Sequence, residues 1–230
     1  MKPREIARLE HELSEYLEHF ISGLGRPERR EALRLYMTGL LLDGERKSIA
    51  PMAGRLVDEE SEIEAMRQRL QQAVTVAGWS DGEVLARLAR KLDAELPGVE
   101  AFVIDDTGFP KKGKHSVGVQ RQYSGTLGRV DNCQVAVSLH LAGEQGSGMV
   151  GFRLFLPDSW ITDRKRRKSA GVPSDACAST KGALALAQLD AALAAGVRHH
   201  VVLADAGYGD STEFREAIVQ RAALCGGRQR

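Results

Sequence analysis

Two short apolar runs that each end in an acidic residue constrain the fold most. The run Ala101–Asp105 (AFVID) leads into Asp106 and a glycine turn, and Val201–Asp205 (VVLAD) leads into a second glycine turn. Such runs, bounded by turn residues, are typical of buried strands, and a carboxylate at the end of a strand lies at the edge of its sheet. Two of them can present two carboxylates to one divalent cation at a phosphodiester. Turns rich in Asp and Gly also end strands that have no such role, so spacing alone leaves both interpretations open.

The spacing of apolar residues changes near residue 98. Residues 4–96 repeat apolar side chains every three or four positions, which predicts a series of helices, and Pro97-Gly98 breaks this pattern. After it we expect strands at 101–105, 132–140 and 150–156, a helix at 180–195, a strand at 201–204 and a helix that begins near Asp210. The sequence therefore predicts an α/β protein, with a helical N-terminal domain at 1–98 and a mixed-sheet domain at 99–230.

Positive charge is concentrated around the first acidic strand. The 230 residues carry a net charge of +1, but residues 1–100 carry −4, residues 101–170 carry +5 and residues 171–230 carry 0. This distribution suits a polyanionic substrate such as DNA. The candidate phosphate contacts, which could equally be solvated surface residues, are Lys111, Lys112, Lys114, Arg164, Lys165, Arg166, Arg167 and Lys168.

Cysteine content and hydropathy indicate where in the cell the protein is expected. Cys133, Cys177 and Cys225 are widely spaced and form no Cys-x-x-Cys pair, which argues against a zinc site and a disulfide framework. The N-terminus has no signal-peptide pattern, and no apolar run approaches the roughly 20 residues that span a bilayer. We expect a cytoplasmic protein with no membrane partner.

Long segments of the chain resemble a known family. IDDTGFPKKGKH at 104–115, VLADAGYGDSTEFREA at 202–217, LLLDGERKSIAPMAGRL at 40–56 and LFLPDSWITDRKRRKSAGVP at 154–173 are similar to bacterial insertion-sequence transposases of the DDE superfamily. The resemblance implies an RNase H-like catalytic domain, two Mg²⁺ or Mn²⁺ ions, and cutting and joining of DNA at element ends. It also implies DNA as partner, a homo-oligomer and association with the bacterial nucleoid. No organic cofactor is expected.

The resemblance also assigns the acidic residues. The family's first Asp stands in an Asp-x-Thr pattern, which falls on Asp105, with the adjacent Asp106 as the alternative. Its second Asp stands in an Asp-x-Gly-Tyr turn and falls on Asp205. In the implied sheet the first and fourth strands are neighbours, so the two carboxylates should meet. We thus expect Asp105, Asp106 and Asp205 to be the catalytic candidates, and Asp105 and Asp205 to bind metal.

The family's third carboxylate, a Glu well downstream of the second Asp, has no counterpart. After Asp205 the chain has only Glu213 and Glu216, both in the helix directly following. We therefore expect a C-terminally truncated transposase, without the last strand, this Glu and the closing helix, that binds metal weakly and cleaves little DNA alone. The alternatives are a non-enzymatic regulator that binds DNA or a full-length transposase, and a chain that does not fold stably because a sheet edge and face stay uncovered.

Two other interpretations are less consistent with the sequence. The segment at 108–115 (GFPKKGKH) nearly fits a P-loop, but His115 supplies no metal-binding hydroxyl and no helix pattern follows. The adjacent Asp105 and Asp106 would point to opposite faces of a strand, unlike the two acids of haloacid-dehalogenase phosphatases. The role of the N-terminal helices stays open between recognition of element ends and dimerisation, because they carry net negative charge.

Overall fold

The computed structural model describes residues 3–76, 78–198 and 200–226. The chain divides into two compact units, residues 1–87 and 88–230. This division falls inside helix α5 (Asp81–Glu95), whereas the sequence placed the domain boundary after that helix, at residue 98. Each unit is described below by itself.

The first unit is entirely helical in its described residues, as predicted. Its small core is made by buried side chains from α1, α2 and the turn after α4, with Trp79 packed against them. Trp79 is fixed there because its indole N–H donates to the Ala73 carbonyl at 3.0 Å. The helical elements are α1 (Pro3–Ile21), α2 (Pro27–Leu41), α3 (Ile49–Ala53), η1 (Glu60–Glu62), α4 (Ile63–Gln71), the π turn η2 (Gln72–Val76) and the start of α5.

Helix α1 buries only part of its apolar stripe. Leu17 and Phe20 are 2% and 3% exposed, whereas Ile6 and Leu9, two to three turns earlier, are 41% and 42% exposed. Arg87 closes the other end of this helix, since its guanidinium donates to the carbonyl oxygen of Phe20 at 3.0 Å. The core of the unit therefore lies around the C-terminal half of α1.

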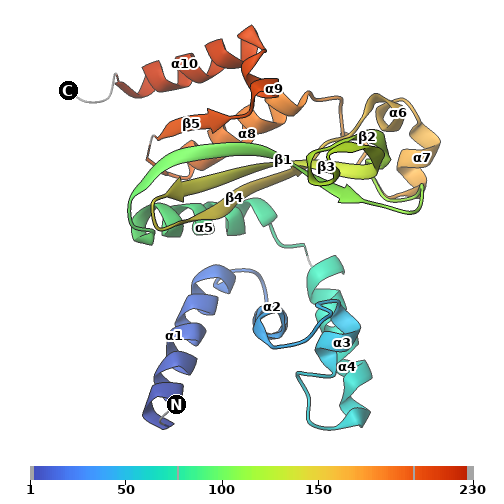
Figure 1. Ribbon diagram of the computed structural model, residues 1–230. Helices are drawn as coiled ribbons and strands as arrows, with labels where there is room; N and C mark the ends of the chain where they lie inside the picture. Colours follow the sequence, from blue (N-terminus) through green and yellow to red (C-terminus); the bar gives the residue numbers. More distant parts are fainter. Residues whose placement is uncertain (1–2, 77, 199, 227–230) are drawn as a thin grey trace. The chain divides into compact units, whose positions relative to one another are not determined.

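The second unit is built on a five-stranded mixed sheet, shown in Figure 1. The strands run in the order β2-β3-β1-β5. The first part of the long strand β3 pairs with β2, and its second part pairs with β4. Only β1 and β5 are parallel. The elements are β1 (Val99–Pro110), β2 (Gln120–Ser124), η3 (Gly125–Leu127), β3 (Arg129–Gly143), β4 (Gly146–Leu154), α6 (Asp158–Ile161), α7 (Arg164–Ser169), α8 (Lys181–Ala194), β5 (Val201–Ala204), α9 (Ala206–Gly209) and α10 (Thr212–Gly226).

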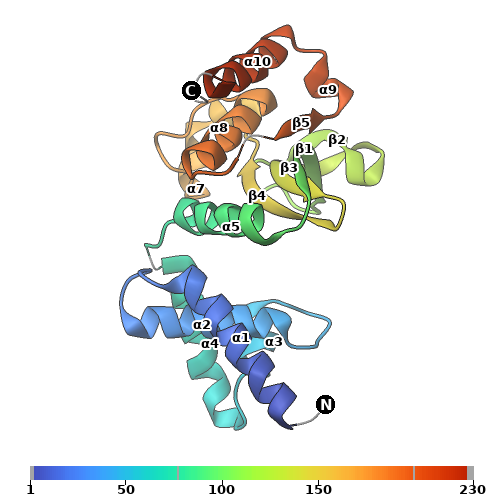
Figure 2. The ribbon, with the colours of Figure 1, turned by 90° about the vertical axis from the view of Figure 1, so that its left-hand side faces the viewer.

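The long helices of this unit lie on one face of the sheet. Figure 2 shows α8 to the left of the strands and α5 below them, and α10 packs on α8. Phe102 and Ile104 of β1 and Leu139 of β3 point to this face and are 1%, 1% and 0% exposed. Among the described residues no helix covers the opposite face, where Leu203 is 51% exposed. After the register shift between Val99 and Ala101, residues at odd positions of β1, Asp105 included, point to this open face because successive side chains alternate.

The predicted α/β class is confirmed, and so is the order of the main elements. The sequence missed the short strand β2 and the short helices α3, α6, α7 and α9, each of which lacks enough residues to show a hydrophobic period. No helix in the described part of the chain has the length and apolar composition of a membrane span.

The turn before β2 depends on a glycine. Gly118 has φ +78°, and a Cβ atom there would lie 2.9 Å from the backbone oxygen of Phe155. Gly118→Ala should lower the free energy of unfolding by about 1–2 kcal/mol for the left-handed backbone and by a further ~1–3 kcal/mol for the steric overlap. Urea denaturation measures this loss.

Gly128 provides the matched control. It has φ +63°, but a Cβ atom there would have no neighbour within 4 Å. Gly128→Ala should therefore show only the backbone cost, and equal losses for the two variants would contradict the packing described around Gly118.

Candidate active site

Parallel pairing of β1 with β5 brings the first and second acidic segments together. Ile104 pairs with Ala204, the last residue of β5, whereas β1 continues beyond this pair to Pro110. Asp205 therefore follows the end of its strand, but Asp105 lies inside β1 next to that end and is not followed by the predicted glycine turn, because residues 105–110 stay paired with β3. Active sites in α/β proteins lie at the carboxyl end of parallel strands. The sequence-based expectation that these two strands are neighbours is confirmed.

Both carboxylates are exposed, and each uses one oxygen in a local hydrogen bond. Asp105 Oδ1 accepts the backbone N–H of Asp106 at 2.7 Å. Asp205 is the N-cap of α9, and its Oδ1 accepts the backbone N–H of Tyr208 at 3.1 Å. These bonds orient the two side chains. The second carboxylate oxygen of each accepts no hydrogen bond within the described residues, so it is available to an external ligand.

Asp106 has a different environment, although it is the neighbour of Asp105. Because strand residues alternate, its side chain points to the face that α8 covers. There its two oxygens accept from Lys181 Nζ at 2.5 Å and from the Tyr208 hydroxyl at 2.6 Å. The Asp106 and Lys181 side chains are 25% and 35% exposed, so the pair is partly shielded from water. Asp106 is therefore engaged by groups of the protein itself.

Tyr208 connects the two acidic strands. It is 6% exposed, and it lies three residues after Asp205 while its hydroxyl donates to Asp106 on β1. Burial is the main cause that raises the pKa of Tyr208 well above its usual value, and the hydrogen bond to Asp106 and the charges of Asp106, Asp205 and Asp105 raise it further. The phenol is thus held neutral, as a hydrogen-bond donor.

The start of β5 is anchored by a second buried carboxylate. Asp93 of α5, 7% exposed, accepts the backbone N–H of Arg198 at 3.1 Å and pairs with His200 Nε2 at 2.8 Å. Burial would raise the pKa of Asp93, but hydrogen bonds from Arg198 and His200 outweigh it and hold the pKa below its usual value. The chain that enters β5 is therefore fixed by a charged network.

Asp105 and Asp205 are the residues of this site that fit a divalent cation. Mg²⁺ takes hard oxygen ligands and keeps several waters, so two carboxylates with free oxygens suit it. Glu213 and Glu216 are exposed on α10, in the helix that follows α9. No group of three or more His, Cys, Asp or Glu residues arranged to hold a metal occurs within residues 3–76, 78–198 and 200–226.

The predicted basic residues gather at a hollow at the other end of the unit. A cavity of about 570 Å³ is lined by Lys114, Lys165 and Arg166, with His115, Asn132 and Asp163 among the polar residues beside them. The structure therefore brings one residue of the lysine segment and two of the Arg164–Lys168 run together. Lys111, Lys112, Arg164, Arg167 and Lys168 do not line this hollow.

Two arginines of the run are used inside the protein. Arg166 donates to the Lys114 carbonyl at 2.8 Å, and its guanidinium stacks over the fully buried Trp160 at 3.7 Å from the ring centroid. Arg167 donates to the Ala176 carbonyl at 2.8 Å. The exposed cations of the run are Arg164, Lys165 and Lys168.

Sequence analysis missed Lys181 and Tyr208 as parts of the site. Tyr208 had a local signal, because its position three residues after the N-cap Asp205 directs it back toward the sheet. Lys181 lies 75 residues from its partner Asp106, and nothing in its neighbourhood indicates this contact.

Removal of the Tyr208 hydroxyl tests this network through pH. Tyr208→Phe should lower the free energy of unfolding at pH 7 by about 1.5–3 kcal/mol, because Asp106 loses a hydrogen bond to a charged acceptor. The folded-state pKa is raised, so the contribution is complete below the ordinary phenol pKa, near 10, and is lost as pH rises above it. Urea denaturation from pH 7 to pH 11 should show the difference between wild type and variant shrinking above pH 10. A constant difference would contradict the buried phenol–carboxylate bond.

Comparisons with known proteins identify the family of the chain. Residues 19–228 match the family model described as DDE superfamily endonuclease. A probable transposase for insertion sequence element IS701 from Microchaete diplosiphon is 28% identical over 213 residues, which cover 92% of this chain and 51% of that protein. The chain thus spans about half the length of this curated relative. No solved structure matches. Because the family match covers most of its residues, the chain belongs to the DDE superfamily endonucleases.

Proposed function

We propose that this chain carries the metal-binding core of a transposase active site, in which Asp105 and Asp205 bind Mg²⁺ or Mn²⁺ and the substrate is a DNA phosphodiester at an element end. The observation that supports this most is the parallel β1–β5 pairing up to Ile104 and Ala204, because the next residue of each segment is an exposed aspartate with one oxygen that accepts no hydrogen bond within the described residues. Asp106 is left out of the ligand set because Lys181 and Tyr208 already occupy its oxygens.

In this proposal the side chains of the site position the metal and the DNA, and none of them reacts covalently with the substrate. Asp105 and Asp205 would hold the metal, and the Asp106–Tyr208 bond fixes the turn that carries Asp205 relative to β1. Lys181 offsets the charge of Asp106, which lowers the repulsion among three neighbouring carboxylates. Two bound ions would activate the attacking oxygen and stabilise the leaving oxygen of the phosphodiester.

We expect this chain alone to cleave little DNA. Two carboxylates supply few of the oxygen ligands that two divalent ions need, and Glu213 and Glu216 follow Asp205 too closely to match the family's third acid. The same observation favours a second candidate, a non-enzymatic regulator that binds element ends or a full-length transposase. A strand-cleavage assay in Mn²⁺ separates the two, because nicking that disappears in Asp205→Asn excludes a purely regulatory role.

The basic hollow provides a second surface for DNA in the same unit as the acidic site. Lys114 and Lys165 line it and have no carboxylate partner within the described residues. Phosphate contacts of this kind position DNA without reading its sequence. The first unit would supply end recognition or dimerisation, and the protein would act as a homo-oligomer on the nucleoid in the cytoplasm.

Metal binding tests the carboxylate pair directly. Asp105→Asn and Asp205→Asn should each raise the Kd for Mn²⁺ at least about tenfold, since loss of even an outer-shell partner of a metal costs 10- to 100-fold. Mn²⁺ titration followed by electron paramagnetic resonance measures this. The control is Asp210→Asn, which removes an exposed carboxylate five residues after Asp205, and an equal effect of this variant would mean non-specific binding.

DNA affinity tests the basic hollow. Lys114→Ala combined with Lys165→Ala should weaken duplex binding and reduce the dependence of log K on log salt by about 2, because two phosphate contacts are lost. Fluorescence anisotropy at several salt concentrations gives both quantities. Lys112→Ala combined with Lys168→Ala changes charge equally outside the hollow, and a reduction as large for this pair would show that net charge alone governs binding.

A further inference from the structure

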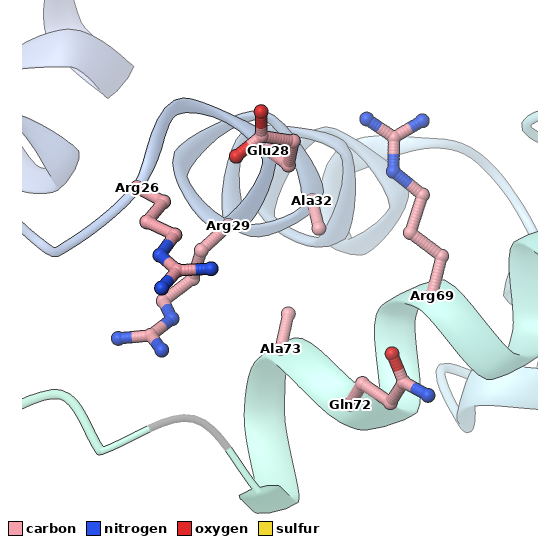
Figure 3. A pocket seen from close by; sticks show the side chains of 7 residues that line it. All are labelled: Arg26, Glu28, Arg29, Ala32, Arg69, Gln72 and Ala73. Carbon is pink, nitrogen blue, oxygen red and sulfur yellow. The ribbon is translucent and has the colours of Figure 1, made fainter.

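The helical unit contains a basic groove that lies outside the carboxylate site. Figure 3 shows Arg26 and Arg29 on one side of the groove, Arg69 on the other, and Ala32 and Ala73 between them. Ala32 and Ala73 are 3% and 4% exposed and belong to the core of the unit, so the floor is fixed and has no side chain beyond a methyl group. The cavity measures about 570 Å³.

No acid of the described residues forms a direct bond with the three arginines of the groove, although Arg69 adds its charge to the hydrogen bond from Arg34 that holds the pKa of Glu31 below its usual value. None of their guanidinium groups makes a hydrogen bond or an ion pair within the described part of the chain. Nearby acids are already used, since Glu31 pairs with Arg34 at 2.5 Å and Glu64 pairs with Arg67 at 2.6 Å. Glu28 is the one acid among the lining residues. The groove thus concentrates unpaired positive charge in a unit with 13 Lys and Arg and 16 Asp and Glu.

Local backbone geometry shapes the groove on the Arg29 side. Gly25 has φ +88°, and a Cβ atom there would lie 2.7 Å from Arg29 Nη1, so the absence of a side chain at Gly25 makes room for this guanidinium. Arg26 precedes α2 as its N-cap, with no side-chain cap, and Pro27 is the first helical residue. The positive end of the 15-residue helix α2 therefore adds to the field of the arginines.

We propose that this groove binds the phosphate backbone of DNA. Guanidinium groups match phosphate oxygens with paired, charge-assisted hydrogen bonds, and they are less hydrated than ammonium groups. Arginines on both sides of a methyl-lined floor suit a chain of successive phosphates rather than one small anion. The choice of DNA rests on the proposed function, whereas the anion-binding groove itself rests only on the geometry of the first unit.

An acidic peptide is the alternative occupant of such a groove. DNA is favoured because all cations of the groove are guanidinium groups, and its lining residues include no large apolar side chain that could anchor a peptide. Peptide-binding sites owe much of their affinity to buried apolar anchors. The experiment below therefore includes poly-glutamate as a second probe.

The test uses the full chain and a short fluorescein-labelled DNA duplex of arbitrary sequence. Combined Arg26→Ala, Arg29→Ala and Arg69→Ala should weaken binding roughly 10- to 100-fold and reduce the slope of log K against log salt by about 2 to 3. The matched control is Arg4→Ala with Arg8→Ala and Arg46→Ala, three exposed arginines of the same unit outside the groove. Equal loss in the control would overturn the proposal.

Glu28→Gln keeps the test valid if the triple variant folds poorly. It removes the groove's single acid and should tighten DNA binding about two- to fivefold, whereas Glu10→Gln on α1 should leave it unchanged. No gain with Glu28→Gln, or weaker binding of poly-glutamate but not of DNA in the triple variant, would overturn the proposal. Failure of the carboxylate site is distinguishable, because Asp205→Asn would then leave Mn²⁺ affinity unchanged while groove-dependent DNA binding persists.

Discussion

The parallel pairing of β1 with β5 is the interaction on which the candidate site depends. β5 has four residues and pairs with β1 through Ala101, Phe102, Val103 and Ile104. So short a strand would be held weakly by its ladder alone. Its entry is fixed by the network of Asp93, and its exit by the Tyr208 hydroxyl bonded to Asp106. The relative position of the two carboxylates is therefore set by contacts at both ends of β5, outside the ladder.

Strand alternation gives two adjacent acids different roles. Asp105 and Asp106 differ little in sequence context, but one side chain leaves the open face and the other enters the face covered by α8. On that covered face Asp106 meets Lys181 and the neutral phenol of Tyr208. Asp106, bonded in this way, stabilises the turn that carries Asp205. A residue that binds a metal must instead have carboxylate oxygens that accept no hydrogen bond from the protein. This difference supports our proposal that Asp105, and not Asp106, binds the metal.

Much of this fold could be predicted from sequence because its long elements have clear periods. The strand 201–204 and the helix near 180–195 follow from apolar runs and caps, and Thr180 does cap α8 by accepting the Ala183 N–H. Contacts between residues far apart in sequence could not be predicted, since Lys181 contacts Asp106 only because α8 packs on the sheet. Spacing predicts a helix but not its burial, because Ile6 and Leu9 have the helical spacing of apolar residues yet are 41% and 42% exposed.

Charge counts locate basic surfaces poorly because a guanidinium is available only when no carbonyl or carboxylate of the protein binds it. In the electropositive middle third, Arg166 and Arg167 donate to carbonyls of Lys114 and Ala176, so the run provides fewer free cations than its sequence indicates. In the acidic first unit, Arg34 and Arg67 pair with Glu31 and Glu64, whereas Arg26, Arg29 and Arg69 make no ion pair within the described residues. Whether a segment can bind a polyanion is therefore decided by its internal pairing, and a net negative unit can carry a phosphate site.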